Sequence, residues 1–400
     1  MKNGGELRYN GRKSPAEFRV ASTKERQEQT MDYNDLINQA MKQVKNEENK
    51  LQHVNILIAG KSGVGKSTLI NAAFRADLAQ TGMGRPVTKE IQLIEKPGVP
   101  IKIYDTVGFE LDKKVQKRTI KEIKKLAKEK RKNAVPDDDI HCMWYCVSAP
   151  SDRFEDIEEN FINDIAALGI PVILVLTKVF SKEAATQLEA TIRLLKPKIH
   201  SVVQVLAKDS EFVPSFGIKE LVEETCELLP ASIQNSFVNA QKGSLALKRK
   251  KSNLVVKASV ATSFGEGFIP IPVADAPLII ATQMAMLAKI TTIYGIDIKK
   301  NRLETVFASI IGILAATTGG KTAVSSLFKM MPGVGTLVGG MISGGVASLI
   351  TTALGQSYIQ LMELTISGKI DLSELPADQL ETMFTDLFSN YLKKFKGLKH

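Results

Sequence analysis

The residues best suited to chemistry lie in one glycine-rich stretch, GKSGVGKST, at residues 60–68. The stretch matches the pattern G-x-x-x-x-G-K-[S/T], follows an apolar run at 54–59 and opens the helix-like segment TLINAAF. In this context glycines let the backbone curl until successive N–H groups point at phosphate oxygens, and a helix N-terminus adds partial positive charge. We therefore expect phosphate-binding residues at Gly60, Ser62, Gly63, Val64, Gly65, Lys66, Ser67 and Thr68.

Two side chains of this loop have defined roles in the expected site. Lys66 is a point charge that would reach the β- and γ-phosphates of a nucleoside triphosphate. The Ser67 hydroxyl is placed to ligate Mg²⁺. The strand before the loop and the helix after it make a chance glycine loop a poor alternative.

Two further segments occur where a phosphate switch needs them. DTVG, residues 105–108, ends the third apolar run, so that Asp105 would hold Mg²⁺ through water and the Gly108 N–H would bind the γ-phosphate. The loop TGMGRPVTKE, 81–90, contains Thr88, which would complete the Mg²⁺ shell. Aspartate before a glycine turn is also a common turn former, so the order of the motifs carries this interpretation. The expected metal ligands are Ser67, Thr88 and Asp105.

The composition is that of a folded, basic chain. Its 400 residues are 44% hydrophobic and 24% charged, which favours two domains with real cores. The net charge of +10 indicates attraction to an anionic partner, for which nucleotide, membrane surface and nucleic acid all qualify. Three cysteines predict neither a disulfide framework nor a zinc site, and the polar N-terminus lacks an apolar signal core. We expect a cytoplasmic protein.

Six apolar runs alternate with helix-length segments over residues 51–235. This alternation predicts an α/β domain with a mostly parallel six-stranded sheet. The runs 91–96 and 101–106 are joined only by PGVP, 97–100, which permits an antiparallel hairpin and no parallel return. The runs are 54–59, 91–96, 101–106, 140–147, 171–177 and 202–207.

The remaining chain has a different texture. Residues 1–50 are expected to be a flexible segment with a helix beginning near Asp32. Residues 236–400 are expected to form an all-helical, apolar domain behind a basic junction at 239–253. The run 331–362 contains no Asp, Glu, Lys or Arg.

The ordered motifs resemble those of translation-factor-class P-loop GTPases, in the style of the Era-, septin- and dynamin-like branches. The resemblance covers roughly residues 51–230 and includes the antiparallel hairpin. It implies a domain that binds GTP or GDP with Mg²⁺ and hydrolyses GTP to GDP and phosphate. Residues 265–297 resemble the C-terminal helical region of certain bacterial GTPases of the YcjF type.

The base-reading motif of that family is incomplete here. Its lysine stem packs over the purine, and its aspartate two residues on pairs with guanine N–H groups; Phe180 stands at the aspartate position. A phenyl ring cannot distinguish guanine from adenine. Asp209 could substitute, although a solvated loop residue is the better expectation for it. GTP is favoured with weakened discrimination, ATP being the alternative, and the expected base-side residues are Thr177, Lys178, Ala207 and Lys208.

The hydrolytic machinery is also incomplete. Phe109 occupies the position where many switch proteins carry a water-positioning glutamine, so intrinsic turnover should be slow. Arg85, in the loop before Thr88, is the candidate for charge stabilisation, in cis or across a dimer, and Glu110 is a weaker one. The catalytic set is then Lys66, Thr88, Gly108 and Arg85. The alternative is a nucleotide-dependent scaffold or assembly switch with little hydrolysis.

Two segments leave the choice of partner open. The basic helix expected at 113–132 is either an ordinary solvated helix or a surface that faces acidic lipid or a partner. Nucleic acid fits less well, because no aromatic residues are interleaved with the basic ones. The run 331–362 exceeds the ~20 residues that span a bilayer, but its Gly, Ser and Thr equally suit a buried glycine-rich hairpin. We expect a guanine nucleotide as ligand, and a homodimer, a higher assembly or an anionic membrane as further partners.

Overall fold

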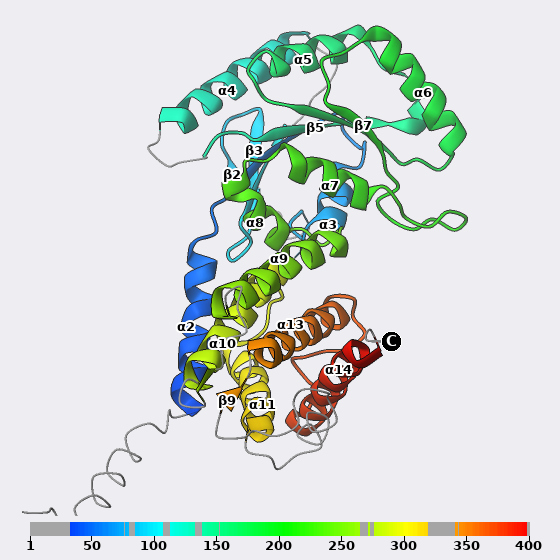
Figure 1. Cartoon of the computed structure of the whole chain (residues 1–400). Helices are drawn as coiled ribbons and strands as arrows, with labels where there is room; N and C mark the ends of the chain where they lie inside the picture. Colours follow the sequence, from blue (N-terminus) through cyan, green and yellow to red (C-terminus); the bar gives the residue numbers. More distant parts are fainter. Residues whose placement is uncertain are drawn as a thin grey trace, which may run out of the picture.

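The chain forms an α/β domain followed by a helical region, shown in Figure 1 as the upper and lower parts of a computed structural model. The structure describes residues 33–75, 77–79, 85–106, 113–132, 138–151, 153–264, 271–272, 276–318, 341–342 and 344–397. Residues 1–32 of the expected flexible segment 1–50, and residues 331–340 of the expected hairpin 331–362, lie outside the described residues.

The α/β domain is built on one sheet with strand order β2-β3-β4-β1-β5-β6-β7. All six expected strands form, and β3 and β4 pair antiparallel across the 97–100 hairpin while β4, β1, β5, β6 and β7 pair parallel. A two-residue strand, β2, is added antiparallel at the edge. The strands are β1 Val54–Ala59, β2 Arg85–Pro86, β3 Ile91–Glu95, β4 Ile101–Thr106, β5 Cys142–Ser148, β6 Val172–Thr177 and β7 Ser201–Gln204.

Helices cover both faces of this sheet, because its central strands are apolar on both sides. Helices α4 (Lys113–Lys132), α5 (Asp156–Ala166) and α6 (Lys182–Leu195) lie on the face away from the helical region (Figure 1). Helices α3 (Lys66–Ala73), α7 (Ile218–Leu228) and α8 (Ala231–Ala240) lie on the other face. The side chains of β1 alternate accordingly: Ile56 and Ile58 join the core under α3, and Leu57 joins the core under α4.

The expected helical region is confirmed by five long helices. They are α9 Leu245–Phe264, α10 Ala276–Tyr294, α11 Lys300–Thr318, α13 Gly344–Ile366 and α14 Ala377–Gly397. Two residue pairs, β8 (Ile271–Pro272) and β9 (Met341–Ile342), form a short antiparallel ladder beside them. The basic junction at 239–253 is no linker, since most of it belongs to α8 and α9.

The helix that precedes the sheet in the sequence packs on the helical region that follows the sheet. Helix α2 (Tyr33–Asn49) contacts α10 and α11, burying Leu36, Ala40 and Val44 at helical spacing. The same core continues through α8 to the sheet, where Phe237 packs edge-on against Phe74 and Phe74 stacks on Trp144. The division expected at residue 235 therefore falls within α8.

The uncharged part of the C-terminal region packs tightly on its neighbours. Gly355 of α13 faces α9 so closely that an added Cβ would lie 2.5 Å from a methyl group of Val256. Several polar side chains within this core pair with one another, as in the Gln283–Thr351 and Thr291–Tyr358 hydrogen bonds. Among the described residues, none of the helices combines the length and the apolar character needed to cross a membrane.

Candidate functional site

The glycine-rich loop turns between β1 and α3 at the carboxyl end of the sheet. Gly60 has φ 143°, and a Cβ there would lie 2.4 Å from the Cys146 carbonyl oxygen, so only glycine fits. Gly65, with φ 103°, caps α3, and its carbonyl accepts the Leu69 N–H at 2.9 Å. Ser62, Ser67 and Thr68 are exposed at this turn. The loop thus presents backbone N–H groups, hydroxyls and a helix N-terminus to solvent.

Lys66 and Asp105 meet beneath this loop. The Lys66 ammonium donates to the Gly60 carbonyl at 3.1 Å and lies 3.7 Å from Asp105 Oδ1. Their side chains are only 13% and 19% exposed. Burial raises the pKa of Asp105, while the Lys66 charge acts in the opposite direction. Asp105 Oδ1 has no hydrogen-bond partner among the described residues.

These groups suit a bound Mg²⁺ ion. A buried carboxylate oxygen without a hydrogen bond and an exposed serine hydroxyl, Ser67, at the start of α3 are hard oxygen donors. No cluster of three His, Cys, Asp or Glu side chains occurs in the described part of the chain. One carboxylate, one hydroxyl and substrate phosphates are the ligands that Mg²⁺ takes in nucleotide sites.

Of the other residues expected to contact the γ-phosphate or Mg²⁺, the structure describes only some. Thr88 is partly exposed after β2, where its hydroxyl accepts the Glu90 N–H at 3.1 Å and its N–H donates to Ile91. No hydrogen bond or ion pair between described residues joins Thr88 to Ser67 or Asp105. Arg85 is placed by its backbone, opposite Leu93 in the β2–β3 ladder. Gly108, Phe109 and Glu110 lie outside the described residues.

Two of the expected base-side residues, Thr177 at the end of β6 and Lys178 after it, contact the phosphate loop. The buried Thr177 hydroxyl donates to the Val64 carbonyl at 2.7 Å, so it supports the loop. Lys178 has φ 55°, and its ammonium donates to the Gly63 carbonyl at 2.6 Å. Its Cε lies 3.8 Å from where a Gly65 Cβ would be, so the stem crosses the loop as the motif requires.

Phe180 stands where the motif has its guanine-reading carboxylate, and Asp209 is the candidate substitute. The Phe180 side chain points to solvent with 53% exposure. Asp209 is exposed, and its Oδ1 accepts the Ser215 N–H at 2.6 Å, a hydrogen bond that lowers its pKa. The Asp209 carboxylate is therefore hydrogen-bonded within its own loop, as expected for a solvated loop residue. Ala207 is partly buried beside it, and Lys208 is exposed.

Comparison with known families decides the class of the site. A family model described as 50S ribosome-binding GTPase matches residues 55–178. Residues 55–178 are a P-loop GTPase domain. A second model, described as a domain of unknown function (DUF697), matches residues 239–389, which places a separate family on the helical region.

Several individual proteins are similar to the GTPase domain. Neuronal-specific septin-3 of Danio rerio is 30% identical over 144 residues, a match that covers 30% of this chain and 40% of septin-3. Magnetosome membrane protein 22 of Magnetospirillum gryphiswaldense is 25% identical over 134 residues, covering 34% of this chain and 67% of that protein. The chain thus spans less than half the length of septin-3.

Two solved structures are among those that align with part of this chain. A probable GTP-binding protein engB aligns over 44% of this chain and 98% of its own, with 24% identity and a TM-score of 0.33. Era of Aquifex aeolicus bound to GDP and AlF4⁻ aligns over 56% of this chain and 74% of its own, with 18% identity and a TM-score of 0.30.

The sequence motifs did not predict one network of ion pairs and hydrogen bonds in the GTPase domain. The Lys61 ammonium lies 3.2 Å from Glu155 and 3.6 Å from the buried Glu158, at the start of α5. Glu158 also accepts the Tyr145 hydroxyl at 3.1 Å and closes a capping box with Glu155. Lys61 is thereby tied to α5 from within the phosphate loop. The Glu-x-x-Glu spacing at the helix start was the available signal.

Proposed function

We propose that the chain is a Mg²⁺-dependent GTPase that hydrolyses GTP to GDP and phosphate and transmits its nucleotide state to the helical region. The approach of Lys66 to Asp105 beneath the phosphate loop carries this proposal. A cation for phosphate oxygens and a carboxylate for Mg²⁺ are here brought together from two separate motifs. The GTPase family match over 55–178 supports the same activity.

The residues divide between holding the metal and holding the phosphates. Ser67 and Asp105 would hold Mg²⁺, which when bound neutralises charge on the β- and γ-phosphates. Lys66 and the N–H groups of residues 60–68 hold the phosphate chain, while Lys178 covers the base. Arg85 in β2, Thr88 before β3 and Gly108, which follows β4 in the sequence, complete the proposed set. Turnover is slow, because Phe109 cannot orient water.

Two elements connect the phosphate site with the helical region. Helix α3 begins at Lys66 and is followed by Arg75, while β4 runs from the 97–100 hairpin to Asp105. At the far ends, the Arg75 guanidinium donates to the Gly98 carbonyl. The pair Lys66–Asp105 at one end and the pair Arg75–Gly98 at the other thus join the same two elements. A shift of β4 relative to α3 on nucleotide exchange would reach the hairpin.

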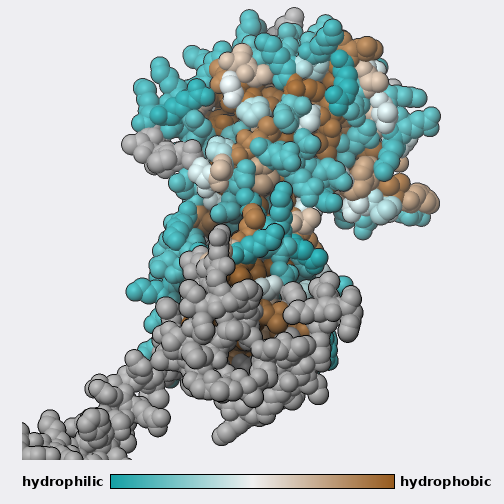
Figure 2. Space-filling model, in the orientation of Figure 1, coloured by the Kyte–Doolittle hydropathy of each residue, from teal (hydrophilic) through white to brown (hydrophobic). Residues whose placement is uncertain are grey.

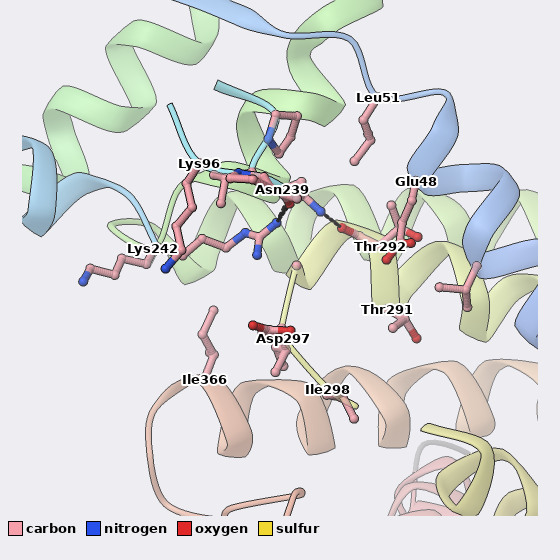
Figure 3. A pocket seen from close by; sticks show the side chains of 18 of the residues that line it. Glu48, Leu51, Lys96, Asn239, Lys242, Thr291, Thr292, Asp297, Ile298 and Ile366 are labelled. Atoms are coloured by element: carbon pink, nitrogen blue, oxygen red, sulfur yellow. Dashed lines mark hydrogen bonds between the residues drawn. The ribbon is translucent and has the colours of Figure 1, made fainter. Parts of the chain in front are cut away.

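Arg75 continues this connection into the helical region. Its guanidinium also donates to Asn239 Oδ1 at 2.9 Å, and Asn239 donates onward to the Thr292 carbonyl at 2.5 Å. Burial lowers the pKa of Arg75, while Asp297 and Glu48 raise it. Figure 3 shows Asn239 hydrogen-bonded to Thr292 at the edge of a pocket of about 1010 Å³, which is lined by the hairpin and by the ends of α2, α10 and α13. This space leaves the hairpin room to move.

A buried lysine lies where the C-terminal ends of α8 and α10 meet. Lys248 of α9 is fully buried and donates to four backbone carbonyls, of Val238, Asn239, Ile293 and Tyr294. These are the last carbonyls of α8 and α10, where helix dipoles favour a cation. Burial and the nearby Arg75 charge lower the pKa of Lys248, whereas only the ammonium form supplies three donors. Lys248 thus joins the C-terminal ends of α8 and α10.

A second candidate is a nucleoside triphosphatase that accepts ATP as well as GTP. It is favoured by the exposure of Phe180 and by the hydrogen bond that holds Asp209 to Ser215 in its own loop. Without a carboxylate, discrimination rests on the Ala207 N–H, which suits guanine O6. A related alternative is a nucleotide-dependent scaffold or assembly switch with little hydrolysis, favoured by Phe109.

Single-turnover hydrolysis of GTP and of ATP, measured over a range of protein concentrations, separates these functions. A GTPase of the proposed kind releases phosphate faster from GTP, requires Mg²⁺ and loses activity in Lys66→Ala. A rate per molecule that rises with concentration, and falls in Arg85→Ala, would assign Arg85 across a dimer. Equal rates with both nucleotides would favour the purine-nonselective enzyme, and no release at any concentration would favour the scaffold.

A further inference from the structure

Helix α4 (Lys113–Lys132) presents one apolar and one basic face. Its buried face packs on the sheet through Ile120, Ile123, Leu126 and Ala127. Because the helix lies on the side of the sheet away from the helical region, its other face looks outward (Figure 1). Figure 2 shows mainly hydrophilic residues at the upper left of the α/β domain, where α4 lies in Figure 1.

The outward face carries a straight row of lysines, here called the lysine stripe. Its members are exposed, and their spacing of three or four residues, apart from the adjacent Lys124 and Lys125, puts them within an arc of about 100° along about 22 Å of helix. The two glutamates of the helix, Glu122 and Glu129, fall outside this arc. The stripe consists of Lys117, Lys121, Lys124, Lys125, Lys128 and Lys132.

The stripe is not used in folding. None of its ammonium groups has an acidic partner among the residues that the structure describes. The basic residues beside it are paired: Arg118 lies 3.3 Å from Glu90, Lys130 lies 2.8 Å from Asp138, and Arg131 lies 3.3 Å from Asp139. Like charges four residues apart on a helix, such as Lys121 and Lys125, repel one another. The stripe therefore weakens the helix that carries it.

We propose that the lysine stripe docks the chain on the surface of an anionic lipid bilayer. A straight row of cations on a convex helix can touch a flat surface along its whole length, and lipid headgroups require no fixed pairing geometry. Lysine suits diffuse negative charge as a hydrated point charge. Nucleic acid is less suitable, since α4 carries no aromatic side chain on which a base could stack.

The stripe differs from the other basic segment, at 242–251. There Lys248 is buried on four carbonyls, Arg249 pairs with Glu363, and Lys251 donates to Gln234. That segment is therefore largely committed to the fold. Docking through α4 keeps the helical region on the side away from the bilayer (Figure 1), and it involves no apolar insertion.

The test is sedimentation of the full chain with phosphatidylcholine vesicles that contain phosphatidylserine, beside vesicles of phosphatidylcholine alone. The wild-type chain is expected to pellet only with the anionic vesicles. Added salt should release it, because the distance over which charges attract one another becomes shorter as the ionic strength rises. The triple variant Lys121→Gln, Lys124→Gln, Lys128→Gln should lose about a hundredfold in vesicle affinity, at roughly fivefold for each lysine.

A matched control removes the same charge elsewhere. The variant Lys219→Gln, Lys257→Gln, Lys289→Gln takes one exposed lysine from each of α7, α9 and α10 and should keep most of the wild-type affinity. If both variants lose the same vesicle affinity, binding depends on net charge alone, and the proposed docking through the lysine stripe is wrong. Absence of binding to anionic vesicles, or tighter binding to RNA under the same conditions, would also overturn it. Nucleotide binding by the stripe variant stays unchanged, so this outcome is independent of the proposed GTPase activity.

Discussion

The Thr177 hydroxyl donates a hydrogen bond to the Val64 carbonyl at 2.7 Å, joining the end of β6 to the phosphate loop. The Val147 carbonyl of β5 lies 3.1 Å from the same hydroxyl. Thr177 is buried, and Lys178 next to it reaches Gly63. Consecutive residues of the base-side motif thus hold the phosphate loop in place.

Thr177→Val should therefore weaken binding of GTP and GDP alike. The substitution keeps the shape and leaves a buried carbonyl without its donor, which costs about 1–2 kcal/mol. We expect about tenfold weaker binding and a lower denaturation midpoint. Thr191→Val is the control, because its hydroxyl is exposed on α6 and bonds only within the helix. Unchanged affinity in Thr177→Val would assign the loop geometry to its glycines alone.

Lys66→Ala should abolish nucleotide binding. The substitution removes the cation facing the β- and γ-phosphates and leaves Asp105, a partly buried carboxylate, without its counter-charge. Titration with a fluorescent GTP analogue measures the loss, and Lys219→Ala, an exposed lysine of α7, is the control. Wild-type affinity in Lys66→Ala would contradict the proposed phosphate site.

For the base, GDP should compete better than ADP, but by less than a carboxylate reader achieves. Phe180→Asp should widen the preference for GDP by at least about tenfold, because a carboxylate at this position can accept two guanine N–H groups. Phe212→Asp adds the same charge to the neighbouring loop, where Phe212 is 87% exposed, and should leave the preference unchanged. If both variants act alike, the effect is one of charge and not of base reading.

The fold of the GTPase domain could be predicted because its signals are local. The loop at 60–68 and the hairpin at 97–100 are short segments in which glycine, proline and spacing limit the backbone to few conformations. The strands followed from apolar runs of the right length, and the antiparallel β3–β4 pair from a connection too short for any other arrangement.

The roles of the lysines could not be predicted, because local sequence does not show which of them the fold buries. The segment KRKK at 248–251 and the basic helix at 113–132 look alike as charge runs. Only the packing of α8, α9 and α10 places Lys248 among four carbonyls while Lys121 and Lys124 stay in water. The same holds for Arg75, whose partners Gly98 and Asn239 are far from it in sequence.

Lys248→Met should destabilise the protein strongly. Methionine fills a similar volume but leaves four buried carbonyls without a donor, so we expect a loss of about 3–5 kcal/mol in the free energy of unfolding. Lys250→Met, two residues on and exposed, should change stability by no more than about 0.5 kcal/mol. Urea denaturation with matched slopes gives both values. A small loss in Lys248→Met would show that water can replace the ammonium group at the junction.

Arg75→Ala should uncouple the helical region from the nucleotide. Arg75 touches both the hairpin that leads to Asp105 and Asn239, which leads to α10. In the wild-type chain, exchange of GTP for GDP should change amide hydrogen exchange at the end of α10 and in residues 295–298, which line the pocket beside the hairpin. In Arg75→Ala this difference should disappear while nucleotide affinity changes by less than about threefold, since the guanidinium does not contact the phosphate loop. Lys242→Ala is the control, because Lys242 lines the same pocket but its ammonium group lies 3.9 Å from Asp77 and is not among the partners of the Gly98 and Asn239 hydrogen bonds. A nucleotide-dependent difference that persists in Arg75→Ala would place the coupling elsewhere, and an equal loss in Lys242→Ala would assign it to the charge of the pocket.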